Sequence, residues 1–225
     1  MNESYMFTLS ELEEDALKEF FNMGLGKAAN SLSEMVHNEV LLSLPLLKVV
    51  PYEQATRMLV ADQDDKLVAV RQNFYGDLSG TALLIFPGAN SLELVRTLLS
   101  EEMPLDVLTE LEQETLQDVG NVIINAFLES FTQMMTLELE FEAAEFLKGS
   151  SRFLLDLSSH LTAQQQILMA HSGGNEEPVF VLMMDFKTGD DTLTQHTLSG
   201  FVVLLFTSQA MRRLRRELDR ILSAL

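Results

Sequence analysis

The chain has 225 residues, 47% of them hydrophobic, and a formal net charge of −19. This length and apolar content are enough for a substantial core, in one domain or in two fused halves. The charge argues against nucleic-acid binding, which requires a basic surface, and the acidic body favours a partner with a basic patch.

The absence of cysteine excludes disulfides, zinc–thiolate sites and thiol nucleophiles. No apolar stretch approaches the ~20 residues that a membrane span needs. The first residues, Met1 to Ser4, do not form the basic region followed by an apolar run that is typical of a secretion signal. We therefore expect a cytoplasmic protein that is not inserted in a membrane.

The first expected helix begins after Ser10, because Ser10 and Glu13 have the spacing of a capping box. Apolar positions then continue at helical spacing over several turns. On this helix Asp15, Glu19 and Asn22 are separated by four and then three residues, which places them on one stripe. A carboxylate one turn from a carboxamide could meet a cation and a water molecule together.

Two glycines interrupt this helix, although each costs ~1 kcal/mol relative to alanine in a helix interior. By helical phase, Gly26 follows Asn22 on the exposed stripe, whereas Gly24 lies toward the apolar side. One interpretation is that Gly26 leaves room for a docked molecule and that Gly24 allows a neighbouring helix or strand to pack tightly. The other, that these glycines and Gly120 serve packing only, stays equally open.

The rest of the first half alternates between strand-like and helical patterns. We expect strands over 40–44, 66–75 and 78–86, followed by a helix over 91–99.

The opening motif returns later in the chain. Residues 109–121 repeat the pattern of residues 10–22 at an offset of 99, and the repeat places Glu114, Asp118 and Asn121 on a second helical stripe. Thr109 and Glu112 have the spacing of a second capping box. The sequence therefore predicts a second long helix that presents a similar surface.

The remainder of the second half follows the same order. Residues 198–206 resemble residues 78–86 at an offset of 120, so the second half holds about 21 extra residues, which we assign to a polar stretch from Lys148 to Pro178. We expect strands over 137–141, 179–186 and 198–206, and a C-terminal helix over 209–222. The arginines of this last helix indicate a solvated face, with Leu214, Leu218, Ile221 and Leu222 facing inward.

These patterns predict an α/β (α+β) fold of two pseudo-symmetric halves. Each half has a long surface helix packed on antiparallel strands, in two sheets or in two halves of one sheet, and a helix ends the chain. We expect a single domain over 1–225, built from internal repeats at approximately 10–104 and 109–225.

The first stripe carries a resemblance to a known family. Asp15, Glu19 and Asn22, with 22 residues between Asn22 and Pro45, match the D/S-x3-E-x2-N-x22-P signature of the CheC, CheX and FliY phosphatases of bacterial chemotaxis. The resemblance covers nearly the whole chain, and the size and pseudo-twofold layout are most like CheC.

The resemblance implies hydrolysis of the aspartyl phosphate of a CheY-type response regulator in two-component signalling. It implies that Asn22 positions the attacking water and that Glu19 pairs with the regulator's active-site lysine. The phosphorylated regulator supplies both the leaving group and the magnesium, so positioning of the water is the main task, and a carboxamide suits it. We expect no cofactor on this chain and magnesium on the phosphorylated partner.

The other members of the pattern have supporting roles under the same resemblance. We expect Asp15, Gly26 and Glu114 to contact the partner, and Pro45 to have a structural role in the motif.

The second stripe departs from the signature. It keeps Asn121, but Asp118 stands where glutamate is preferred, Glu114 occupies the first position and Ala144 replaces the proline. Because aspartate is one methylene shorter, its carboxylate sits back from a docked partner. We count Asp118 and Asn121 as catalytic candidates of a weaker or idle site.

One alternative from another class stays open, a non-catalytic binding or adaptor module. In that case the same stripes dock a response regulator, a flagellar-switch component or the deamidase CheD. Other enzyme classes fit less well, because the four histidines lack metal-site spacing and the chain has neither a G-x-S-x-G elbow nor a glycine-rich phosphate loop.

Overall fold

The computed structural model describes residues 9–59, 67–99, 110–156, 178–188 and 198–223. The described helices are α1 (Glu11–Val36), α2 (Tyr52–Met58), α3 (Gly88–Leu99), α4 (Glu110–Met135), α5 (Ser151–Leu155) and α7 (Ser208–Leu222). The described strands are β1 (Val40–Pro51), β2 (Leu67–Gly76), β3 (Gly80–Pro87), β4 (Leu139–Phe141), β5 (Glu145–Gly149), β6 (Pro178–Thr188) and β7 (Leu198–Phe206).

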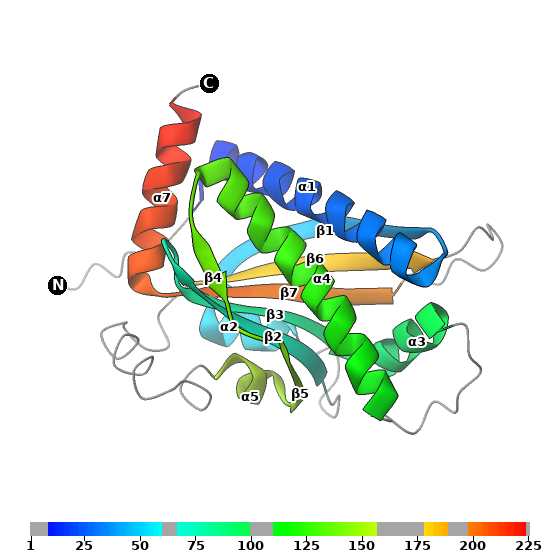
Figure 1. Cartoon of the computed structure of the whole chain (residues 1–225). Coiled ribbons are helices and arrows are strands. Elements are labelled where there is room, and N and C mark those ends of the chain that lie inside the picture. The colour runs from blue at the N-terminus through cyan, green and yellow to red at the C-terminus, as the bar shows by residue number, and fades with distance from the viewer. Residues whose placement is uncertain (1–8, 60–66, 100–109, 157–177, 189–197, 224–225) are drawn as a thin grey trace.

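All seven described strands form a single antiparallel sheet. Its order is β1-β6-β7-β3-β2-β4, and β5 pairs with another part of β2. The α+β class that the sequence predicts is confirmed, and of the two sheet arrangements left open, the structure has two halves of one sheet (Figure 1).

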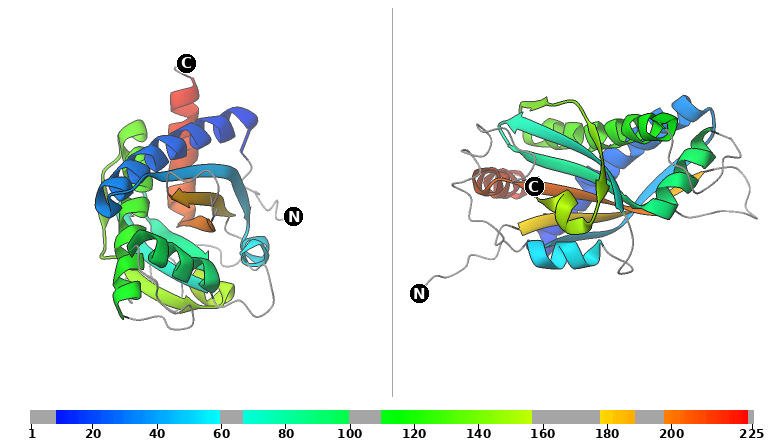
Figure 2. Two further views of the ribbon diagram at one scale, coloured as in Figure 1. Left: turned by 90° about the vertical axis from the view of Figure 1, so that its right-hand side faces the viewer. Right: turned by 90° about the horizontal axis from the view of Figure 1, so that it is seen from below.

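Helices cover both faces of the sheet. Seen from below, α2 and α5 lie on the near side of the strands, whereas α1 and α4 lie on the far side (Figure 2). Each face has its own core: Val68 and Val70 of β2 pack in the cluster with α1 and α4, and Leu67 and Ala69 pack in the cluster with α2 and α5. Burial on both faces explains why β3, β6 and β7 are largely apolar.

The two long helices pack directly against each other. A Cβ at Gly24 would lie 2.9 Å from the Ala126 carbonyl oxygen, so a larger residue does not fit without movement of one backbone. Beside this contact, the Phe21 ring centroid lies 5.4 Å from that of Phe127 and 5.0 Å from that of Phe131. The prediction that Gly24 allows tight packing is confirmed, and Gly120 likewise brings α4 against Val70 of β2.

The order of the sheet is symmetric. Exchanging β1 with β4 and β5, β2 with β6, and β3 with β7 gives the same order read from the opposite edge. Two internal repeats would produce this order. The single domain over 1–225 and the repeat boundaries at 10–104 and 109–225 stay predictions.

Some local predictions were incomplete. The strand expected over 40–44 is the first part of β1, which continues to Pro51 past an irregularity between Ser43 and Leu46. The stretch from Lys148 to Pro178, expected to be a polar insertion, contains the end of β5 and all of α5, whereas residues 157–177 lie outside the described part. Neither α2 nor α5 was predicted, because helices of 7 and 5 residues are too short to show a clear period.

Candidate functional site

A capping box fixes the beginning of α1. The Ser10 backbone N–H donates to Glu13 Oε2 at 2.6 Å, and the Glu13 backbone N–H donates to Ser10 Oγ at 3.3 Å. The prediction from the sequence is therefore confirmed at this end. The second predicted box cannot be compared in the same way, because Thr109 lies outside the described residues, although α4 begins at Glu110.

The first stripe is the set of α1 residues formed by Asp15, Glu19, Asn22 and Gly26. All four are exposed, and the intervals of four, three and four residues keep them on one side of the helix.

Two large apolar side chains border the first stripe. Leu12 is 69% exposed and Met23 is 45% exposed, one near each end of the carboxylate and amide positions. The first stripe therefore has exposed apolar side chains beside its polar positions.

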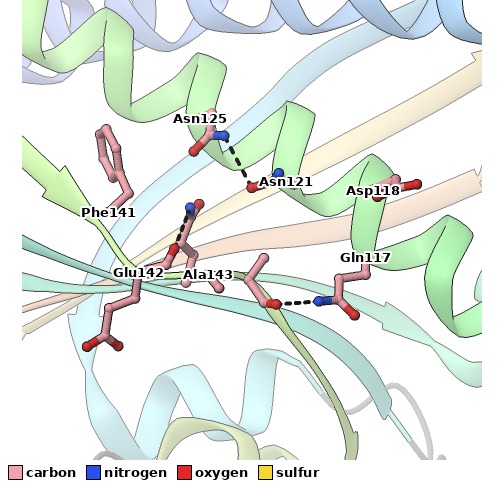
Figure 3. Close-up of a pocket in the computed structure, with 9 residues that line it drawn as sticks. Gln117, Asp118, Asn121, Asn125, Phe141, Glu142 and Ala143 are labelled. Carbon is pink, nitrogen blue, oxygen red and sulfur yellow. Dashed lines mark hydrogen bonds between the residues drawn. The ribbon is translucent and has the colours of Figure 1, made fainter.

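The second stripe, Glu114, Asp118 and Asn121, is equally exposed, on α4. Its next position is Asn125, which is half-buried and whose Nδ2 donates to Asn121 Oδ1 at 3.2 Å (Figure 3). The first stripe has no counterpart to this bond, because Gly26 stands at the corresponding position and carries no side chain.

A hollow of about 400 Å³ lies beside the second stripe. In Figure 3, α4 forms one wall of the hollow, and the chain between β4 and β5 forms the other. Its lining residues are Gln72, Gln117, Asp118, Asn121, Asn125, Phe141, Glu142, Ala143 and Ala144.

Amide side chains hold the wall between β4 and β5 in place. Gln72, only 3% exposed, donates through Nε2 to the Glu142 carbonyl oxygen at 3.0 Å, and Asn73 donates through Nδ2 to Glu142 Oε2 at 2.8 Å. From the helix side, Gln117 Nε2 donates to the carbonyl oxygen of Ala144. These bonds hold the wall opposite α4, and Asp118 and Asn121 of the second stripe line the hollow.

Each stripe is followed in the chain by an interrupted strand. Pro45 is exposed within the irregular pairing between Ser43 and Leu46 of β1, as expected for a residue that lacks a backbone N–H. Ala144, at the corresponding place in the second half, is buried in the gap between β4 and β5. The proline of the motif thus lies at a break in the pairing of β1 with β6, where its missing N–H leaves no backbone bond unmade.

The structure brings the sequence-predicted residues together within each stripe and assigns the two stripes to two neighbouring helices. Sequence reasoning missed Asn125 and the residues of the hollow, chiefly Gln72 and Glu142. The offset of 99 between the repeats would have identified Asn125 as the counterpart of Gly26. No local pattern in the sequence identifies Gln72, because it lines the hollow only through the pairing of β2 with β4 and β5.

Within the described ranges, no group of three or more His, Asp or Glu side chains is arranged to hold a metal ion. Nor does any described helix have the length and apolar character needed to cross a membrane.

Comparison with known proteins gives both sequence and fold relatives. No family model matches the chain. It is 20% identical over 134 residues to the CheY-P phosphatase CheC of Bacillus subtilis (strain 168), a match that covers 58% of this chain. The match spans 64% of the length of that relative, just under two thirds.

Solved structures share the fold over almost the whole chain. FliY of Thermotoga maritima aligns with a TM-score of 0.69 at 13% identity, covering 96% of this chain and all of the other. The FliM middle domain from H. pylori aligns with a TM-score of 0.60 at 10% identity, covering 93% of this chain and 99% of the other. The chain thus resembles the CheC, CheX and FliY family in sequence and has the fold that FliY and FliM share.

Proposed function

We propose that this chain, with its CheC-like sequence and FliY-like fold, is a phosphatase that hydrolyses the aspartyl phosphate of a CheY-type response regulator. The observation that carries the proposal is the first stripe, in which Glu19 and Asn22 are exposed on successive turns of α1 and are followed by Gly26. The relative named as a CheY-P phosphatase supports the choice of substrate.

The chemistry requires little covalent work from this chain. A water oxygen attacks the phosphorus, the bond between phosphorus and the aspartyl oxygen breaks, and the regulator's aspartate leaves as a carboxylate. One hydrogen of the water stays on the attacking oxygen as the P–OH group of inorganic phosphate, and the other leaves as a proton to a phosphate oxygen or to solvent. Magnesium on the regulator would balance phosphoryl charge, so this chain needs mainly to place the water in line.

Asn22 supplies the positioning group in this scheme. Its carboxamide has an acceptor oxygen for a hydrogen of the water and two N–H donors that can face the phosphoryl oxygens. The Glu19 carboxylate, one turn earlier, would pair with the regulator's active-site lysine and fix the docked orientation. Asp15 and Gly26 lie on the same exposed side of α1 and would complete the contact.

The second stripe has the same order of groups with a shorter carboxylate. Asp118 and Asn121 would act more weakly if a regulator docks there at the same distance, because the Asp118 carboxylate lies one methylene closer to its helix. Glu114 would take the place of Asp15 in that contact.

The second candidate is a non-catalytic binding module, favoured by the fold shared with FliM. A solved structure holds FliM in complex with FliG, so this fold also serves assembly with other proteins. Under this alternative the stripes would dock a regulator, a flagellar-switch component or CheD without hydrolysis. The two candidates differ in turnover, since a phosphatase accelerates phosphate loss when present in catalytic amounts.

The experiment is phosphate release from a phosphorylated CheY-type regulator with catalytic amounts of the wild type, Asn22→Ala, Asn121→Ala and the double variant. We expect Asn22→Ala to lower kcat/KM on the order of 100-fold, the loss typical of removing one positioned polar group. Ser31→Ala, also exposed on α1 but on another side, is the matched control and should match the wild type.

Each other result has a definite meaning. Full activity of Asn22→Ala would remove the first stripe from the mechanism, and loss only in the double variant would mean that both stripes act. No acceleration by the wild type would favour the binding module.

A further inference from the structure

Gly26 is a glycine that the protein's own packing does not require. A Cβ at this position would meet no atom within 4 Å, and the residue is exposed inside a regular helix. Glycine destabilises a helix interior relative to alanine, and no contact within the described part of the molecule requires a glycine at position 26. Gly24, two residues earlier, differs because α4 packs against it.

The corresponding position in the second stripe is occupied and bonded. Asn125 stands four residues after Asn121, as Gly26 stands four residues after Asn22. Its side chain donates from Nδ2 to Asn121 Oδ1 at 3.2 Å, which engages one lone pair of the amide that would hold a water. Asn125 also forms part of the wall of the hollow (Figure 3).

We propose that positions 26 and 125 decide how each stripe receives its partner. At Gly26 the phosphorylated face of the regulator can come directly against the backbone of α1 beside Asn22. At the second stripe, the Asn125 side chain closes this approach and holds Asn121 back against its own helix. Asn125 is therefore a positioning residue that keeps the second stripe from hydrolysing the phosphate as the first does.

This inference rests on the proposed function for its choice of partner. Its central claim concerns docking, so it is measured by binding as well as by turnover. The probe is a CheY-type regulator carrying beryllofluoride on its phosphorylatable aspartate, a stable mimic of the phosphoryl group.

The first arm places side chains at position 26. We expect Gly26→Asn to raise the Kd for the beryllofluoride-bound regulator by about tenfold, the loss that corresponds to about 1.4 kcal/mol. KM should rise more than kcat falls, and Gly26→Ala should show a smaller effect in the same direction. The thermal midpoint should stay equal or rise, because alanine and asparagine both favour a helix over glycine.

The second arm removes the side chain at position 125. In the Asn22→Ala background, in which only the second stripe can act, we expect Asn125→Gly to raise kcat/KM for phosphate release at least threefold. Asn125→Ala removes the same hydrogen bond without adding a glycine to α4, so it should also raise the rate. Ser31→Asn, which adds the same amide to α1 away from the stripe, serves as the control for the first arm.

The outcomes separate the two proposals. A Gly26→Asn protein that binds the regulator within twofold of the wild type overturns the role of Gly26. No rate increase with either Asn125 variant overturns the role of Asn125. A wild type that binds but does not release phosphate overturns the proposed function and the role of Asn125 in turnover, whereas the Kd comparison at position 26 still tests the role of Gly26.

Discussion

At the scale of single residues, the two glycines of α1 have opposite surroundings. Gly24 is buried against Ala126 and Phe127 of α4, and Gly26 faces open space. Only the surroundings of Gly24 result from packing against another helix. The same substitution at the two positions therefore has opposite expected effects on stability.

We expect Gly24→Ala to lower the free energy of unfolding by about 1–3 kcal/mol, because the added methyl group overpacks the contact with the α4 backbone. Gly26→Ala should raise it by about 1 kcal/mol, the difference in helix propensity. Urea denaturation of the two variants and the wild type measures both changes. Equal effects of the two substitutions would contradict the packing assigned to Gly24.

Buried polar residues hold the segment between β4 and β5, which forms the wall of the hollow opposite the second stripe. Asn73 donates to Glu142 and accepts a hydrogen bond from Thr81 Oγ1 at 2.8 Å, and the guanidinium of Arg71 pairs with Glu145. These partners come from β2, β3 and the segment around β5. Such contacts hold the interrupted strand in register where few backbone bonds are available.

At the scale of elements, the capping box determines how firmly the first turn of α1 is held. The catalytic candidates Glu19 and Asn22 lie two to three turns further on, whereas Asp15, which we expect to contact the partner, lies closer to the cap. A frayed first turn would disturb Asp15 before it disturbs Asn22.

We expect Ser10→Ala to lower the free energy of unfolding by about 1 kcal/mol, since it removes the acceptor for the Glu13 backbone N–H. Thermal and urea unfolding followed by circular dichroism measure the loss. Ser31→Ala, within the same helix and exposed, is the control and should leave stability unchanged or slightly higher. A Ser10→Ala protein as stable as this control would show that the cap contributes nothing.

The C-terminal helix illustrates how an amphipathic pattern translates into packing. Leu214 and Leu218 of α7 are fully buried, whereas Arg212 and Arg216 are exposed. The sequence interpretation of a solvated arginine face is confirmed for these positions. One arginine of the run, Arg213, pairs with Asp77 at 2.8 Å and so ties α7 to the turn between β2 and β3.

At the scale of the whole molecule, the dominant property is the net charge of −19. An acidic body attracts a partner with a basic patch over distances limited by the Debye length, about 10 Å at 0.1 M salt. This attraction affects the rate of encounter more than the chemical step.

We expect the association rate constant for the phosphorylated regulator to fall by about tenfold or more between 20 mM and 300 mM salt, as screening removes the steering. Stopped-flow fluorescence measures this rate, and kcat at saturating regulator should change much less. A rate constant independent of salt would contradict electrostatic steering by the acidic surface.

The sequence by itself determined the long helices, the main strands and the stripe positions. Capping residues and hydrophobic periodicity are local signals, and the repeats at a fixed offset strengthened the predictions based on them. The observed α1, β2, β3, β6 and β7 therefore lie close to the predicted ranges. The relative positions of Glu19 and Asn22 follow from helical geometry alone, so no tertiary information was needed to place them on one stripe.

Only the tertiary structure decided how the halves combine and what surrounds each stripe. The joining of both halves in one sheet depends on strand pairs such as β3 with β7, which are distant in the chain. The hollow depends on the pairing of β2 with β4 and β5, which brings Gln72 beneath α4. Such long-range contacts produce no periodicity in the sequence. The residues of a strand indicate that the strand is buried, but they do not indicate which strand pairs with it.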